Sequence, residues 1–153
     1  MELVFSRTMK DIDGNMIDLS YLNKKVVLVV NTASKCELTK QLRGLESLYQ
    51  RFKNKDFIII AFPANNFGRQ EPLTDEGIAK TYRYEYGVTF PIMSKIDVVE
   101  GNSDPLFKEL CKRSGNVPEW NFSKYLVNRG RDVFYFPPKE TVDNVTARIE
   151  ATL

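Results

Sequence analysis

The sequence predicts an α/β fold in which a mixed central sheet is flanked by helices and preceded by a β-hairpin. Two unbroken apolar runs, residues 26–30 and residues 57–62, are typical of strands that are covered on both faces. Between these runs, apolar side chains recur at helical spacing from Leu38 to Phe52. Strand, helix and strand therefore form a parallel βαβ unit, and its crossover should be right-handed.

Turn and capping residues divide the rest of the chain into short elements. Asp13-Gly14 suits a primed turn and predicts a hairpin that joins residues 9–12 to residues 16–19. Thr74 and Asp104 have the character of helix N-caps. The elements expected after the βαβ unit are a helix ended by Gly87, a strand over residues 90–98, a helix from Pro105 to Gly115, strands over residues 122–127 and 132–136, and a helix after Pro138 that buries Val142, Val145, Ile149 and Leu153.

Composition restricts the class of protein. The chain has 153 residues, of which 42% are hydrophobic, so we expect one globular domain over residues 1–153. The 22 lysines and arginines nearly balance the 20 aspartates and glutamates and are scattered, which does not favour a nucleic-acid partner. No apolar stretch has the length of a membrane span or the form of a cleavable signal, and we expect a soluble, cytoplasmic protein.

The absence of histidine excludes several kinds of catalytic site. Without an imidazole, neither a Ser-His-Asp or Cys-His arrangement nor a histidine-ligated metal can form. The two cysteines, Cys36 and Cys111, are far apart in the chain and resemble neither a disulfide framework nor a zinc site. We therefore expect no metal and no bound cofactor.

Cys36 lies where the first buried strand ends and a helix begins, in the stretch NTASKCELT. At the first turn of that helix, the dipole and the unpaired backbone N–H groups favour thiolate over thiol. Lys35 and Lys40 act in the same direction, whereas Glu37 opposes them. The alternative that this position leaves open is that Cys36 is a small buried hydrophobic residue, as free cysteines commonly are.

The predicted order of elements is that of the thioredoxin fold with an N-terminal hairpin and an inserted middle segment. In this fold a cysteine lies at the position of Cys36, and a second cysteine usually follows shortly after it. Here the following residues are Glu37, Leu38 and Thr39, so dithiol exchange of the ordinary kind is not expected.

Three stretches together resemble the glutathione peroxidase family. They are NTASKCELT at residues 31–39, AFPANNFGRQEP at residues 61–72 and WNFSKYLV at residues 120–127, in the order and spacing of that family. The resemblance extends over essentially the whole chain. It implies a thioredoxin-like fold and a thiol-dependent peroxidase that reduces hydrogen peroxide or organic hydroperoxides, with glutathione or thioredoxin as electron donor.

The resemblance also implies which residues act. Cys36 would attack the hydroperoxide, and Gln70, Trp120 and Asn121 would supply the supporting polar groups. In such enzymes the thiolate attacks one peroxide oxygen in line with the O–O bond and becomes a sulfenic acid, while the other oxygen leaves as water or an alcohol. Negative charge moves from sulfur to the departing oxygen, so neutral N–H donors lower the barrier without any histidine.

One departure from the family concerns the return of Cys36 to the thiol. Many relatives with a catalytic cysteine carry a resolving cysteine at the position that matches Tyr82 here. Cys111 is expected on the buried face of its helix, so a one-cysteine cycle with an external thiol is the simpler expectation. Lys35, Arg69 and Lys124 could attract an anionic thiol such as glutathione.

Two other functions stay open at this point. A long-lived sulfenic acid on Cys36 would suit a peroxide sensor or relay that forms mixed disulfides with a partner protein. A thioredoxin-fold binding module without catalysis would show no peroxide-dependent oxidation of Cys36. The chain lacks the extra loop that resembles the interface of tetrameric relatives, which favours a monomer.

Overall fold

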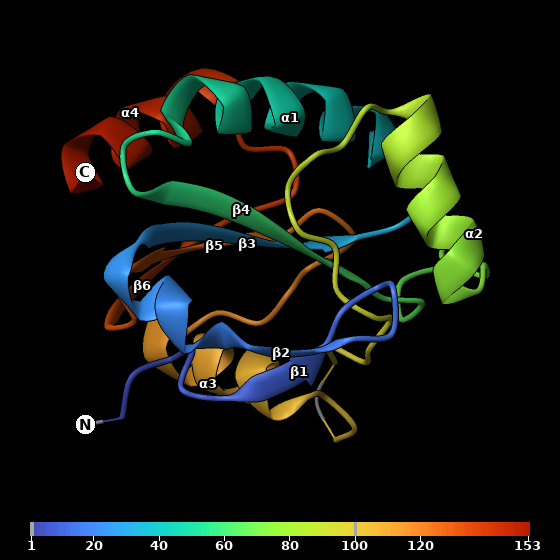
Figure 1. The fold of residues 1–153 in the computed structure, drawn as a ribbon, viewed down its shortest axis with the longest axis horizontal. Coiled ribbons are helices and arrows are strands. Elements are labelled where there is room, and N and C mark those ends of the chain that lie inside the picture. The colour runs from blue at the N-terminus through green and yellow to red at the C-terminus, as the bar shows by residue number, and fades with distance from the viewer. Residues whose placement is uncertain (1, 100) are drawn as a thin grey trace.

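The computed structural model describes residues 2–99 and 101–153 (Figure 1). Within these residues the sheet consists of the strands β3 (Val26–Thr32), β4 (Phe57–Pro63), β5 (Lys124–Asn128) and β6 (Asp132–Phe136). Their order is β4-β3-β5-β6. β3 runs parallel to β4 and antiparallel to β5, which also pairs antiparallel with β6. The prediction of a mixed sheet with two apolar neighbouring strands is confirmed.

Helices cover both faces of this sheet. The remaining elements are the hairpin strands β1 (Thr8–Lys10) and β2 (Met16–Asp18), the helices α1 (Gln41–Phe52), α2 (Asp75–Lys80), α3 (Pro105–Ser114) and α4 (Val142–Thr152), the 3-10 helices η1 (Leu19–Lys24) and η2 (Glu37–Lys40), and the π-helical turn η3 (Thr81–Glu85). Figure 1 shows α1 and α4 on one face of the sheet, α3 and the β1-β2 hairpin on the other, and α2 at one end.

β3 contributes side chains to two cores, one on each face of the sheet. Val26, Leu28 and Val30 pack with residues of α1 and α4, whereas Val27 and Val29 pack with residues of α3 and the N-terminal segment. Because both faces are covered, every residue of β3 is buried, and its first five residues form an unbroken apolar run.

The sheet brings three distant parts of the chain to one end of the molecule. Thr32 at the end of β3 pairs with Pro63 at the end of β4, and the start of β5 lies beside Val30. The loops that follow β3 and β4 therefore emerge next to the loop that precedes β5. These loops contain the three sequence motifs.

Capping residues act as the sequence predicts. The Thr74 hydroxyl accepts the N–H of Gly77 at 3.2 Å, and Asp104 Oδ1 accepts the N–H of Leu106 at 2.9 Å. Gly115 ends α3 in the left-handed conformation, with φ of 74°. These signals involve residues close in sequence, so tertiary packing does not override them.

The strand expected over residues 90–98 does not form. Ile92 and Met93 make isolated bridges to Ala61 and Asp11. The backbone alternates between two partners, since the N–H of Met93 donates to the carbonyl of Ala61 on β4 and the N–H of Ser94 donates to the carbonyl of Lys10 on β1. The segment lies between the edge of β4 and the hairpin, since the N–H of Ile96 again donates to the carbonyl of Pro63 of β4, and its apolar residues are buried by contacts with both partners rather than in a continuous ladder.

Three expected burials are also wrong, and one of them is Leu153, which is only partly buried. Val142 is 62% exposed because it begins α4 at the mouth of the groove between α1 and α4, whereas Val145 and Ile149 are buried as predicted. Cys111 is half-buried at the side of α3, next to the fully buried Leu110.

Among the described residues, no helix has both the length and the apolar character needed to cross a membrane.

Candidate active site

Cys36 is the N-cap of η2, the short helix that precedes α1. Its sulfur accepts a hydrogen bond from the backbone N–H of Leu38 at 3.4 Å. Thr39 closes the cap, since its hydroxyl accepts the N–H of Cys36 at 3.0 Å and donates to the carbonyl of Ala33 at 2.8 Å. A thiol thus occupies a position that serine, threonine or aspartate usually fills. The sequence predicted one long helix here; the structure has a 3-10 turn first, and α1 begins at Gln41.

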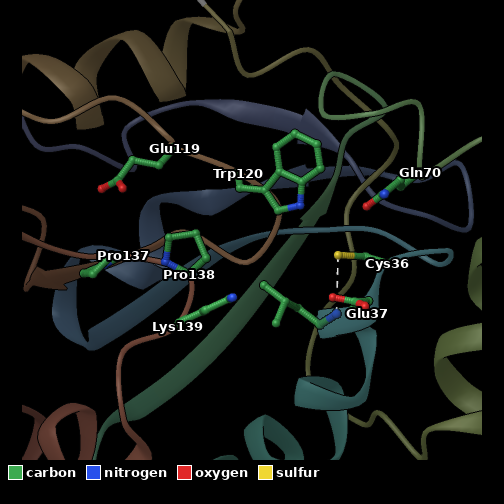
Figure 2. A pocket seen from close by; sticks show the side chains of 9 residues that line it. Cys36, Glu37, Gln70, Glu119, Trp120, Pro137, Pro138 and Lys139 are labelled. Atoms are coloured by element: carbon green, nitrogen blue, oxygen red, sulfur yellow. Dashed lines mark hydrogen bonds between the residues drawn. The ribbon is translucent and has the colours of Figure 1, made fainter.

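A cavity of about 570 Å³ opens beside Cys36. Figure 2 shows the indole nitrogen of Trp120 and the amide group of Gln70 pointing toward the sulfur, with the segment 137–139 across the cavity. Cys36 is half-buried and borders this open space. Its position is therefore that of an accessible thiol rather than of a buried hydrophobic residue.

Asn121 lies behind Gln70 and does not line the cavity. Asn121 is fully buried, and its Nδ2 donates to Gln70 Oε1 at 2.9 Å. This bond engages the amide oxygen of Gln70 and leaves the Nε2 donor of Gln70 for the cavity. Of the predicted site residues, Asn121 therefore contacts Gln70 and not the cavity itself.

Trp120 is held by contacts on one side of its ring. The ring lies against Phe67 with 5.5 Å between centroids, and 38% of Trp120 is exposed. Gly68 has φ of +64°, and a Cβ there would lie 3.1 Å from the Trp120 ring and 3.3 Å from Gln70 Nε2. Glycine at this position therefore lets the loop approach both donors.

Backbone and amide hydrogen bonds join the three motifs. The N–H of Lys35 donates to the carbonyl of Gln70 at 2.9 Å. Asn31 Nδ2 donates to the carbonyl of Trp120 at 3.0 Å, and the Asn31 carbonyl accepts the N–H of Phe122 at 2.6 Å. The loop of Cys36 is thus fixed directly to the loops that carry the two donors.

Glu71 is a buried carboxyl beside the site that the sequence motifs alone do not indicate. Its carboxylate is fully buried, and Oε2 accepts hydrogen bonds from Ser34 Oγ at 2.9 Å and from the Tyr82 hydroxyl at 2.7 Å. The same hydroxyl lies 2.9 Å from Thr32 Oγ1. The sequence feature that could indicate Glu71 is an acidic residue next to Gln70 inside the second motif. The burial of Glu71, however, depends on α2 and η3 packing over that loop.

Comparison with known proteins decides the family. A family model described as glutathione peroxidase matches residues 4–111. The chain belongs to the glutathione peroxidase family. It is similar to the glutathione peroxidase-like peroxiredoxin gpx1 of Schizosaccharomyces pombe, with 52% identity over 124 residues and 78% of each chain covered. The glutathione peroxidase homolog BsaA of Staphylococcus epidermidis is 39% identical, with 100% of both chains covered.

A solved structure of the same fold agrees with this assignment to the family. The crystal structure of Trgpx in apo form is 34% identical and has a TM-score of 0.80, with 99% of this chain and 96% of that chain covered. The predictions of a thioredoxin-like fold, of the family and of a thiol-dependent peroxidase are confirmed.

The two thiols of the chain lie on opposite faces of the sheet. Cys36 packs against the core that contains α1 residues, whereas Cys111 belongs to α3 and lies 3.7 Å from the Tyr125 hydroxyl. Figure 1 shows α1 and α3 separated by the sheet. A disulfide requires Cα atoms within about 7 Å, so joining these cysteines would require the chain to open.

The buried carboxyl of Glu71 predicts a specific pH dependence of stability. Burial raises the pKa of Glu71 above its ordinary value, although Tyr82, Ser34 and Lys95 act to lower it. At pH values between the pKa of Glu71 in the unfolded chain and its higher pKa in the folded protein, the folded protein holds a proton that the unfolded chain has lost. The free energy of unfolding therefore falls as pH rises through this range. Glu71→Gln should remove this loss, and its unfolding free energy should rise relative to wild type by up to about 1.4 kcal/mol per pH unit. Urea unfolding from pH 4.5 to 8 measures this difference.

Asp13 provides a control of opposite sign. Its hydrogen bonds to Arg83, at 2.9 Å, hold the pKa of Asp13 below its ordinary value. Stability from Asp13 is present above the unfolded value of about 3.9 and is lost below it, so Asp13→Asn should lose stability relative to wild type as pH rises from about 2.5 to 4.5, a range to which the urea series is extended. A Glu71→Gln curve that runs parallel to wild type would contradict the assignment.

Proposed function

We propose that this chain reduces hydrogen peroxide or an organic hydroperoxide at Cys36, with Gln70 and Trp120 as hydrogen-bond donors and Asn121 orienting Gln70. The observation that carries the proposal is the convergence of a thiol, the indole N–H of Trp120 and the amide group of Gln70 on one open cavity (Figure 2). Neutral donors suit this reaction because they stabilise charge on either sulfur or oxygen as it moves between them.

In the first half of the cycle, the Cys36 thiolate attacks one oxygen of the peroxide. A sulfur–oxygen bond forms and the O–O bond breaks, so that the electron pair moves to the departing oxygen. That oxygen takes up a proton and leaves as water or an alcohol, and Cys36 becomes a sulfenic acid. Trp120 Nε1 and Gln70 Nε2 donate to the oxygens during the transfer.

In the second half, a thiol from another molecule attacks the sulfenic acid, and water leaves. A second thiol then releases Cys36 from the mixed disulfide. Glu37 and Glu119 line the cavity, opposed by Lys139. Because glutathione is an anion at neutral pH, this charge favours a protein thiol such as that of thioredoxin. Lys124, suggested above as a contact for an anionic thiol, is buried and uses its ammonium inside the protein.

Peroxide consumption tests the cycle when thioredoxin with its reductase, or glutathione, is supplied in parallel. At equal thiol concentration we expect turnover with thioredoxin to be roughly tenfold or more faster. Cys111→Ser should match wild type, since its thiol lies on the other face of the sheet. Faster turnover with glutathione would overturn the choice of reductant, and loss of turnover in Cys111→Ser would overturn the one-cysteine cycle.

A peroxide relay is the second candidate, favoured by the separation of the two thiols. With no nearby internal thiol, the Cys36 sulfenic acid persists until a partner protein reacts with it. Slow turnover with both reductants, together with a Cys36-dependent mixed disulfide in non-reducing electrophoresis, would assign the chain to this function. The monomeric state and the cytoplasmic location stay predictions, and the monomer can be tested by sedimentation.

A further inference from the structure

Lys124, the first residue of β5, has its charged group inside the protein. The residue is 3% exposed, and its ammonium makes three hydrogen bonds. Nζ lies 2.7 Å from the carbonyl of Phe122, 2.9 Å from Gln41 Oε1 and 3.1 Å from the carbonyl of Pro138. An ammonium has three N–H groups, so each donor has one neutral oxygen as its partner.

The first acceptor belongs to the turn that carries Trp120 and Asn121. Phe122 follows them with φ of 68°, a left-handed conformation that is unfavourable for a residue with a Cβ. Its N–H donates to the carbonyl of Asn31, and its carbonyl accepts from Lys124. The ammonium thus secures one side of a strained turn, and Asn31 secures the other.

The other acceptors belong to the far wall of the cavity and to α1. The Pro138 carbonyl accepts from Lys124 and also from Gln41 Nε2 at 2.8 Å. Figure 2 shows Pro138 and Lys139 across the cavity from Gln70. One ammonium therefore connects the Trp120 turn, the wall of the cavity and the start of α1.

We propose that Lys124 is a positioning residue for peroxide reduction, and that its ammonium holds Trp120 and the 137–139 wall at a fixed place relative to Cys36. This proposal rests on the proposed function, because it assigns to Trp120 the stabilisation of peroxide at Cys36. The charge of Lys124 affects the geometry of the site because it sets the number of N–H donors. A neutral amine has two N–H groups and leaves one of the three oxygens without its donor.

The surroundings of Lys124 set the pH at which its ammonium loses one N–H donor, and this pH lies in the alkaline range. Burial lowers the pKa of Lys124 to about 8, while the carboxylate of Glu140 acts to raise it. Lys40 is the other charged residue that lines the adjoining groove between α1 and α4. As the amine forms, the Trp120 turn loses part of its support.

Trp120 reports its own position, since it is the only tryptophan in the chain. We would titrate its fluorescence from pH 6 to 10 in Cys36→Ser, which removes any contribution from the thiolate. Emission should change with a midpoint near pH 8. Adding Lys124→Met should abolish this transition, whereas the matched control Lys40→Met, which removes an exposed charge beside the same groove, should retain it.

Rates measured with Cys36 present test the effect on the reaction. Lys124→Met should slow oxidation of Cys36 by peroxide roughly tenfold or more, because small displacements of a donor reduce its effect strongly. In a Trp120→Phe background the same substitution should add little, since Lys124 acts through Trp120. Wild-type rate and wild-type emission in Lys124→Met would overturn the proposal.

Lys124→Arg keeps the proposal testable if the methionine variant does not fold. Arginine stays charged at these pH values, and the adjoining groove of about 320 Å³ offers room for its larger group. Its emission should show no transition near pH 8, and a retained transition would overturn the proposal. If wild-type Cys36 is not oxidised by peroxide, the proposed function fails, and if Trp120→Phe oxidises as fast as wild type, Trp120 is removed from the mechanism. In both cases the emission experiment still decides whether Lys124 holds the turn.

Discussion

Cys36→Ser is expected to reduce peroxide consumption to the uncatalysed background. A serine hydroxyl is not ionised at neutral pH and is a poor nucleophile toward the O–O bond, so the first step stops. The fold should persist, because serine can accept the N–H of Leu38 as the sulfur does and is a preferred N-cap. Consumption of peroxide with thioredoxin and its reductase measures the activity, and thermal unfolding should differ from wild type by no more than about 1 kcal/mol.

Cys111→Ser is the control, since it removes the other thiol and should retain full activity. If Cys36→Ser still turned over and the Cys36→Ser, Cys111→Ser double variant did not, the reactive thiol would be Cys111. Mass spectrometry after one equivalent of peroxide should find the added oxygen on the peptide that contains Cys36.

Trp120→Phe is expected to slow the oxidation of Cys36 by about 100-fold, the usual cost of losing one donor to a developing charge. Phenylalanine retains a ring that can pack against Phe67, so the principal loss is the indole N–H. The step to measure is the second-order rate of Cys36 oxidation, followed by rapid mixing and thiol trapping. Reduction of the oxidised Cys36 by thioredoxin should change far less, because the N–H acts on the peroxide.

Tyr84→Phe is a matched control, because it also removes a polar hydrogen from an aromatic side chain. Tyr84 is exposed on η3, away from the cavity lining, and its substitution should leave the oxidation rate unchanged. Equal slowing of both variants would show that the rate responds to general destabilisation, and an unchanged rate in Trp120→Phe would remove Trp120 from the mechanism.

Local patterns were sufficient for most of the fold. The apolar runs of β3 and β4, the Asp13-Gly14 turn, and the caps at Thr74 and Asp104 each depend on residues a few positions apart. The segment 90–98 was mistaken for a strand because its apolar residues are buried by contacts with two different partners. Such burial leaves no periodic signal in the sequence.

The candidate site was predictable in its members but not in their arrangement. The motifs identified Cys36, Gln70, Trp120 and Asn121, and the structure brings all of them to one end of the sheet. That Asn121 lies behind Gln70 follows from a side-chain contact across 51 positions of sequence, which no local pattern encodes.

The sequence by itself determined the order of most elements, the family and the candidate thiol, because these depend on local spacing and on motifs. The tertiary structure alone decided the positions of Glu71, Lys124 and Cys111. Charged residues are usually exposed, so a buried carboxylate or ammonium is recognised only when its partners are seen. Ser34 and Tyr82 supply those partners for Glu71, and acceptors from three separate segments supply them for Lys124.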